Sequence, residues 1–171
     1  MATVDPTPAR PASPPAVQRD GTRLGERLLE RGLIDATQLQ YALQKNEVEK
    51  QRLGRILIRH GLANESDIVR VLAEMNGIEY VQVDTLAHAD PQVLAMFNRE
   101  LCQLRQFLPL RRSGDALEVL LGDADTQAVG QLVLQRCGLR CRFLQGEYGK
   151  VARLIRHTYY FAQNPDRKSV V

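Results

Sequence analysis

The chain has 171 residues, 44% of them hydrophobic, and a formal net charge of +3 at pH 7. Its length suits one domain or two small lobes with a real hydrophobic core. The mild charge excludes the dense basic stripe of a protein that follows the phosphates of duplex DNA, and no apolar run approaches the roughly 20 residues that span a bilayer. Three cysteines, an odd number, are more typical of a reducing cytoplasm than of a disulfide framework.

Residues 1–22 hold five of the eight prolines, separated by small and polar residues. Such a segment buries too little apolar surface to offset the entropy lost on ordering it. We therefore expect a disordered, proline-rich tail over residues 1–22. A docking role for this tail is a less favoured alternative.

The stretch that follows the tail occurs twice. Residues 23–46 read RLGERLLERGLIDATQLQYALQKN, and residues 52–75 read RLGRILIRHGLANESDIVRVLAEM. The spacer between the two copies reads EVEKQ. A repeat of this kind indicates a duplicated helical unit, and a duplicated unit can present two similar half-sites to one ligand.

Each copy has the pattern of two short helices separated by a glycine. In the first copy, Thr22 would cap a helix, Gly32 would end it in the left-handed conformation, and Asp35 would cap the next helix. Gly61 and Asn64 take the same places in the second copy. Apolar residues at helical spacing form the expected inner faces: Leu24, Leu28, Leu29, Leu39, Ala42, Leu43, Leu53, Ile56, Leu57, Ile68, Val71 and Leu72.

The rest of the chain alternates strand and helix patterns. Gly77 would close the helical part, Asp90-Pro91 is a strong helix start, and Pro109 favours an edge position for its strand. The expected order is strand 78–83, helix 91–97 with a further turn at 99–104, a hairpin of strands 107–110 and 116–121, helix 126–137, strand 139–144 and helix 147–162.

The predicted fold class is therefore α+β. A lobe of four short helices, arranged as two tandem helix-turn-helix units, would cover residues 23–77. A small α/β lobe would follow over residues 78–163. The last residues, 164–171, are expected to be frayed.

Arg-Leu-Gly at the start of a helix has a specific physical use. Free amides at a helix start attract anions, arginine offers a planar fork to phosphate or guanine, and glycine lets a ligand approach the backbone. Two such corners would match a ligand with two bases and two phosphates. The residues alone leave open the alternative that Arg23 and Arg52 are solvated, while the leucine and glycine that follow each of them serve the packing of the core.

The doubled pattern RLGxxLxxxGLxxxxxLxxxLxxQ resembles the MshEN domain, the N-terminal domain of type II secretion and type IV pilus assembly ATPases. The resemblance covers residues 23 to about 162. The chain is also similar to the C-terminal MshEN-like domain of a bacterial membrane glycosyltransferase that acts with a phage receptor, at the VEKQRLG junction and the NGIEY continuation. The resemblance implies the binding of cyclic di-GMP along the two motifs, with closure of the lobes on the nucleotide.

By position, the resemblance implies ligand contacts at the openings of both units, along their second helices, at their closing positions and at one aspartate after the hairpin. These residues are Arg23, Leu24, Gly25, Leu39, Leu43, Asn46, Arg52, Leu53, Gly54, Ile68, Leu72, Met75 and Asp123, with Asp125 as the alternative to Asp123. Considered without the resemblance, Asp123 would be interpreted as a turn or capping residue.

The closing positions depart from the family pattern, which has glutamine where this chain has Asn46 and Met75. Asparagine can still form hydrogen bonds with a shorter reach, whereas methionine offers only a weak sulfur acceptor. Loss of one hydrogen bond costs about 0.5–1.5 kcal/mol, or up to about tenfold in affinity. Binding could persist with one weakened half-site, or the chain could be a degenerate docking domain that does not bind nucleotide.

Motifs of catalysis and metal binding are missing from the sequence. There is no GxxxxGK[ST], GxSxG or HExxH. Cys137 and Cys141 lack the further ligands that zinc requires, and His60, His88 and His157 are isolated. We expect no enzyme, no metal and no cofactor.

The leading hypothesis is a cytoplasmic regulatory module that binds cyclic di-GMP and passes the signal to a protein partner. That partner would be a secretion or pilus ATPase complex or a membrane glycosyltransferase of exopolysaccharide export. It could recruit the chain to the inner membrane without direct membrane insertion. Acidic residues throughout the helical units argue against a DNA or RNA partner.

Overall fold

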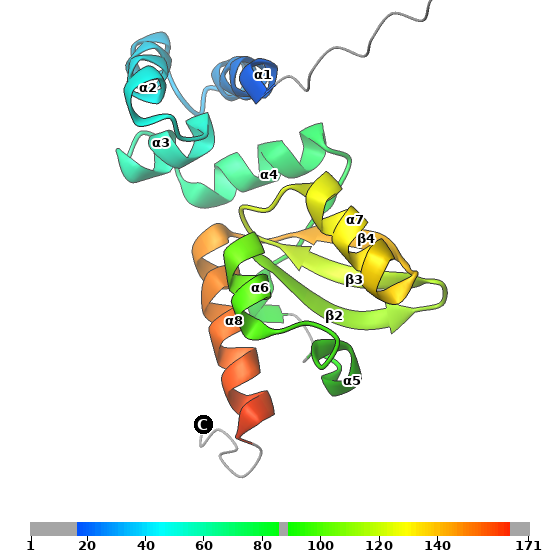
Figure 1. Cartoon of the computed structure of the whole chain (residues 1–171). Coiled ribbons are helices and arrows are strands. Elements are labelled where there is room, and N and C mark those ends of the chain that lie inside the picture. Colours follow the sequence, from blue (N-terminus) through cyan, green and yellow to red (C-terminus); the bar gives the residue numbers. More distant parts are fainter. Residues whose placement is uncertain (1–16, 86–88, 165–171) are drawn as a thin grey trace, which may run out of the picture.

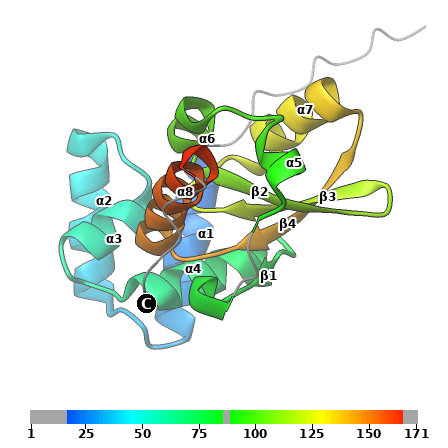
Figure 2. The same ribbon diagram turned by 90° about the horizontal axis from the view of Figure 1, so that it is seen from below.

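The computed structural model of the chain describes residues 17–85 and 89–164. Helices α1 to α3 gather at one end of the molecule, and α4 lies between them and a four-stranded sheet (Figure 1). Helices α6 and α8 lie side by side next to that sheet (Figures 1 and 2). The predicted α+β class is confirmed, while the boundary near residue 77 between two lobes stays a prediction.

The repeated part consists of α1 (Val17–Glu30), α2 (Ala36–Glu49), α3 (Leu53–Arg59) and α4 (Glu65–Met75). Gly32 and Gly61 separate the helices of each pair with φ angles of 65° and 64°, as predicted. Asp35 caps α2 by accepting a hydrogen bond from the Gln38 amide, with the reciprocal bond also present. Asn64 stands at the start of α4, but its side chain does not cap that helix.

The start of α1 differs from the prediction. The helix begins at Val17, so residues 17–22 are helical rather than part of a disordered tail, and Thr22 is not its cap. Residues 17–22 contain no proline, and Gly21 weakens a helix by only about 1 kcal/mol. The rest of the predicted tail, residues 1–16, lies outside the described residues, as do His88 and residues 165–171 of the predicted frayed end.

The helical part has its own hydrophobic cluster, formed by Leu24, Leu28, Ile34, Ala42, Leu53, Ile56, Leu57, Ile68 and Val71. Leu43 was expected on the inner face of α2 but is 40% exposed. Its neighbour Ala42 is fully buried, and the next residue of a helix points about 100° away. The prediction for Leu43 is therefore wrong.

The two units differ in what covers them. Helix α4 buries Val69 and Ala73 and lies against β1 and β4. The matching positions of α2 hold Gln40 and Gln44, which are exposed. The second unit therefore carries the contact with the sheet.

The sheet contains β1 (Glu79–Tyr80), β2 (Phe107–Ser113), β3 (Ala116–Leu121) and β4 (Arg140–Gln145) in the order β1-β4-β3-β2. β2 and β3 form the predicted antiparallel hairpin, and β4 runs parallel to β3 and β1. β2 is an edge strand whose register shifts after Pro109, which agrees with the confinement of proline to edge strands and bulges. The first strand is shorter than predicted, and a 3-10 turn, η1 (Val83–Thr85), begins at the last residue of the predicted range.

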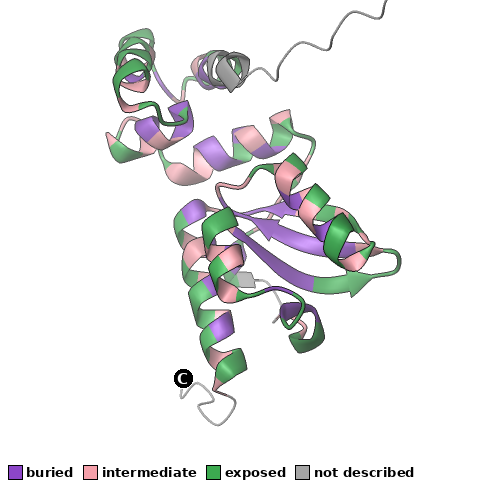
Figure 3. Cartoon of the chain, in the orientation of Figure 1, coloured by how far each residue is buried: buried purple, intermediate pink, exposed green. Residues whose placement is uncertain are grey.

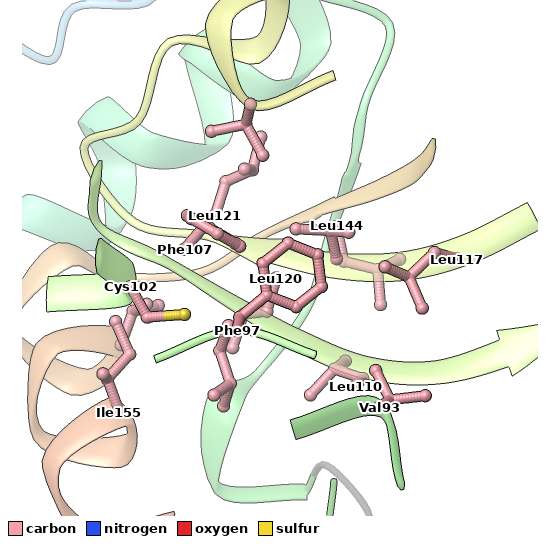
Figure 4. Packing of buried hydrophobic residues seen from close by; sticks show 14 of the residues in the cluster. Val93, Phe97, Cys102, Phe107, Leu110, Leu117, Leu120, Leu121, Leu144 and Ile155 are labelled. Carbon is pink, nitrogen blue, oxygen red and sulfur yellow. The ribbon is translucent and has the colours of Figure 1, made fainter. Parts of the chain in front are cut away.

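Four helices complete the fold: α5 (Pro91–Leu94), α6 (Arg99–Arg105), α7 (Thr126–Cys137) and α8 (Tyr148–Gln163). Helix α5 ends at Leu94, earlier than predicted, and Asn98 caps the separate helix α6 by accepting a hydrogen bond from the Leu101 amide. Helix α7 packs on β4, and α8 packs on β2 and β3. The hydrophobic core formed by the sheet and these helices includes Phe107, Leu117, Leu120 and Ile155 (Figure 4). Strand β3 and the first half of β2 are buried, while the hairpin end of β2 is exposed (Figure 3).

Candidate functional site

The two Arg-Leu-Gly corners pack against each other in a reciprocal way. A Cβ atom added to Gly25 would lie 3.5 Å from Leu53 Cδ2, and one added to Gly54 would lie 3.5 Å from Leu24 Cδ2. Leu24 and Leu53 are each 3% exposed. Because each glycine meets the leucine of the other copy, the two corners are related by an approximate two-fold axis.

Each glycine also lets its helix approach the second helix of its own unit. A Cβ atom at Gly25 would lie 2.6 Å from Leu39 Cδ1, and one at Gly54 would lie 3.1 Å from Ile68 Cγ2. The first separation does not occur between real Cβ atoms and their neighbours, and the second is unusually tight. These leucines and glycines therefore have a packing role, and their contact with a ligand stays a prediction.

The two opening arginines occupy different backbone positions. Arg52 is the N-cap residue of α3, so the second Arg-Leu-Gly opens a helix as predicted. Arg23 lies well inside α1, where the backbone amides are used within the helix. The prediction of an anion-attracting helix start at the first copy is wrong, because α1 extends back to Val17. Both arginine side chains are exposed.

Asp123 joins the second corner to the loop after β3. Its Oδ1 atom accepts a hydrogen bond from Arg52 Nη1 at 2.9 Å, and its Oδ2 atom accepts one from Arg55 Nε at 2.7 Å. Asp125, the alternative candidate, instead caps α7 by accepting a hydrogen bond from the Ala128 amide at 3.0 Å. The structure thus brings two of the predicted residues, Arg52 and Asp123, into an ion pair.

Arg55 was missed in the sequence, and the structure gives it two partners. Besides its bond to Asp123, its guanidinium carbon lies 4.8 Å from the ring centroid of Tyr148, the first residue of α8. Tyr148 is buried, and this burial, followed by the charge of Asp123, raises the pKa of its phenol above the ordinary value. One signal was available: Arg55 stands where the first copy has Glu26.

A second polar contact links the repeat to α8. The Glu65 carboxylate, at the start of α4, accepts a hydrogen bond from the Gly149 amide at 2.9 Å. Glu147, the N-cap residue of α8, gives that helix no side-chain cap. A carboxylate from the helical part therefore satisfies a free amide at the positive end of α8.

The closing positions of the two units are unequal, as predicted from their residue types. The Asn46 side chain donates a hydrogen bond to the carbonyl of Gln51, which ties the end of α2 to the spacer. Met75 is half-buried against the helical cluster. Of the two closing residues, only Asn46 therefore carries a side-chain amide, and it is bonded to the spacer.

The remaining predicted residues are spread from core to surface. Ile68 is fully buried, Leu39 and Leu72 are half-buried, and Leu43 is exposed. Among the residues whose side chains the structure describes, Arg23 forms no ion pair, and Asp123 pairs with Arg52 and Arg55 of the second unit. The exposed members of the predicted set are Arg23, Leu43 and Arg52.

In the part of the chain that the structure describes, no cluster of three or more His, Cys, Asp or Glu residues could hold a metal ion. His60 lies 3.2 Å from a Glu49 oxygen, and the thiol of Cys137 faces the Met96 sulfur at 3.6 Å. No described helix combines the length and apolar character needed to cross a membrane.

Similarity to known proteins covers the sheet and extends into the repeat. The family model of the MshEN domain matches residues 76–164, just over half of the chain. This match covers the sheet and its helices and leaves the repeat outside, so it is narrower than the resemblance expected over residues 23 to 162. Asp123 lies within it.

Curated relatives extend the similarity into the repeat. The type IV pilus assembly ATPase PilB of Thermus thermophilus is 32% identical over 124 residues, which make up 72% of this chain and 14% of the relative. Bacteriophage adsorption protein B of Escherichia coli K12 is 27% identical over 148 residues, 86% of this chain and 20% of the relative. The chain therefore spans only a small part of the length of these relatives.

Two solved structures share the fold. The structure of MshE with cdg, cyclic di-GMP, has a TM-score of 0.69 and 26% identity, and the match covers 80% of this chain and 99% of MshE. The N-terminal domain of XpsE has a TM-score of 0.65 and 22% identity, with 79% of this chain and 92% of that domain covered.

Proposed function

The chain belongs to the MshEN domain family, and from this premise we propose that it is a regulatory module that binds cyclic di-GMP through its tandem repeat. MshE, a structural neighbour at 26% identity, has been solved with this nucleotide. The observation that carries the proposal is the ion pair between Arg52, which opens the second motif, and Asp123 from the sheet loop. It joins a motif residue to the aspartate that the family resemblance selects.

The proposed site uses the exposed residues for contact and the buried ones for support. Arg23 and Arg52 would bind phosphate oxygens or guanine edges with their planar forks. The exposed Leu43 would cover the face of a base or ribose. The wider proposed set comprises these residues with Leu24, Gly25, Leu39, Asn46, Leu53, Gly54, Ile68, Leu72, Met75 and Asp123.

Asp123 suits the recognition of guanine. An ionised carboxylate has about four acceptor positions on its two oxygens. Two of them accept hydrogen bonds from Arg52 and Arg55, which leaves one position on each oxygen. Guanine presents two neighbouring donors, N1–H and the N2 amino group, at the spacing of a carboxylate.

The proposed signal passes through the contacts between the repeat and the sheet. Asp123 joins the loop after β3 to α3, and Glu65 joins α4 to α8, so a nucleotide that contacts both parts favours one of their relative arrangements. A ligand shifts such an equilibrium by the difference of its affinities for the two states. The partner would be a secretion or pilus ATPase complex or a membrane glycosyltransferase. We propose a cytoplasmic location, recruitment to the inner membrane by the partner, and no catalytic activity of the chain itself.

Calorimetric titration with cyclic di-GMP tests the proposal. We expect the intact chain to bind, and Arg23→Ala and Arg52→Ala each to weaken binding by about tenfold, the effect of losing one charged hydrogen bond. Arg153→Ala is the matched control, because Arg153 is exposed on α8 and outside the proposed site. The absence of heat with the intact chain at high micromolar nucleotide would refute the proposal.

A docking domain without nucleotide binding is the second candidate. It is favoured by Met75, which is packed against the helical cluster where the family has a glutamine. This candidate predicts that a captured partner binds with the same affinity in the presence and absence of cyclic di-GMP. A nucleotide-dependent change in that affinity would rule it out.

A further inference from the structure

Asp123 is held by two partly exposed arginines, of which Arg55, with a side chain that is 42% exposed, also contacts an aromatic ring. The Arg52 side chain is 59% exposed and reaches Asp123 through one terminal nitrogen. Arg55 reaches it through Nε at 2.7 Å, and its guanidinium lies over the buried ring of Tyr148. Arg55 is therefore fixed on two sides, whereas Arg52 is free to turn toward solvent.

The position of Arg55 sets the two units apart. It stands three residues after the opening arginine of the second copy, where the first copy has the exposed Glu26. The second copy thus directs two positive charges at one carboxylate. The corresponding pair in the first copy, Arg23 and Glu26, has opposite charges.

From this geometry we infer that Arg55 is a positioning residue that orients the Asp123 carboxylate for one guanine edge and so sets the preference for guanine over adenine. The inference rests on the proposed binding of cyclic di-GMP. Arg55 occupies one acceptor position of Oδ2 and keeps the carboxylate aligned, because the arginine itself is held by the Tyr148 ring. Arg52 can then leave Asp123 to bind the nucleotide without loss of that alignment.

The base preference follows from the donors on the two purines. Guanine offers N1–H and the N2 amino group to an aligned carboxylate, whereas adenine has an acceptor at N1 and no amino group at C2. A good bidentate pair between a side chain and a base discriminates by about 5–150-fold. If Asp123 is no longer aligned, this discrimination falls while contacts shared by both purines persist.

The test compares the affinities of cyclic di-GMP and cyclic di-AMP for the full chain. We expect Arg55→Gln to lower the ratio of the two affinities by about tenfold through weaker binding of cyclic di-GMP, and Arg55→Lys to restore part of it. If Arg55 had a merely structural role, its substitution would weaken the binding of both nucleotides by the same factor, and that result would overturn the inference. Arg59→Gln is the matched control, since Arg59 on the same helix pairs with Glu49 instead.

A second measurement does not depend on nucleotide. In a double-mutant cycle of urea unfolding, we expect Arg55→Gln and Asp123→Asn to be coupled by a factor of about 2–5 in the unfolding equilibrium, as for partly exposed charge pairs. Additive effects would overturn the positioning role. If the intact chain binds neither nucleotide although the coupling is present, the proposed function is refuted, while the positioning of Asp123 by Arg55 is supported.

Discussion

The substitution Gly54→Ala tests whether the repeat is held together by close packing at its Arg-Leu-Gly corners. The added methyl group would lie 3.1 Å from Ile68 Cγ2 and 3.5 Å from Leu24 Cδ2. Ile68 is fully buried and β-branched, so its side chain has no room to rotate away. Overpacking of this kind costs about 1–3 kcal/mol, and the better helix propensity of alanine returns up to about 1 kcal/mol.

The expected net loss is about 1–2 kcal/mol, or roughly 2–8 °C in Tm for a chain of this size. Urea and thermal unfolding by circular dichroism measure it. Gly130→Ala in α7 is the matched control, because its Cβ atom would meet only Phe143 Cζ at the ordinary distance of 3.6 Å. We expect that variant to gain about 0.5–1 kcal/mol. If Gly54→Ala raised the free energy of unfolding as much as Gly130→Ala does, the Arg-Leu-Gly corner would be shown to pack loosely.

Three further substitutions probe the links and the core. Glu65→Ala should cost about 1 kcal/mol, the usual value of a lost helix cap, and should accelerate hydrogen exchange at the Gly149 amide; unchanged exchange there would contradict the contact. Phe107→Ala should cost about 3–5 kcal/mol by urea unfolding, because the ring is fully buried, and a loss below 1 kcal/mol would place it outside the core. Burial raises the pKa of the Cys102 thiol to about 11 from 9.0, so the unfolded chain loses its proton first and stability should fall from pH 9 toward pH 11. Cys102→Ala should reduce this loss of stability by up to about 2 kcal/mol between pH 9 and pH 11. A variant that loses stability as steeply as the intact chain would show that the Cys102 thiol is not the cause.

Features set by neighbouring residues were predictable from the sequence. Gly32 ends α1 and Asp35 caps α2 as expected, because both effects act within one turn of backbone. The hairpin and the position of Pro109 at the sheet edge follow from similarly local rules. The start of α1 could not be predicted from the overall composition of residues 1–22. The prolines before Val17 dominate the composition of the segment, although none of them lies within the helix.

The contacts that build the candidate site depend on tertiary structure. The family resemblance selected Asp123, but no local pattern showed that Arg55, far away in the sequence, would share it. The Glu65 contact with Gly149 was invisible for the same reason. A charge difference between repeated positions, Arg55 against Glu26, was the available signal. It indicates that the copies differ but not which partner Arg55 finds.

The most direct test of the proposed site is a nuclear magnetic resonance titration of the labelled chain with cyclic di-GMP, monitored at backbone amides. We predict that one saturating event shifts the amides around both Arg-Leu-Gly corners, Arg23 to Gly25 and Arg52 to Gly54, together with the loop that carries Asp123. Shifts confined to other surfaces, or none at high micromolar nucleotide, would contradict it.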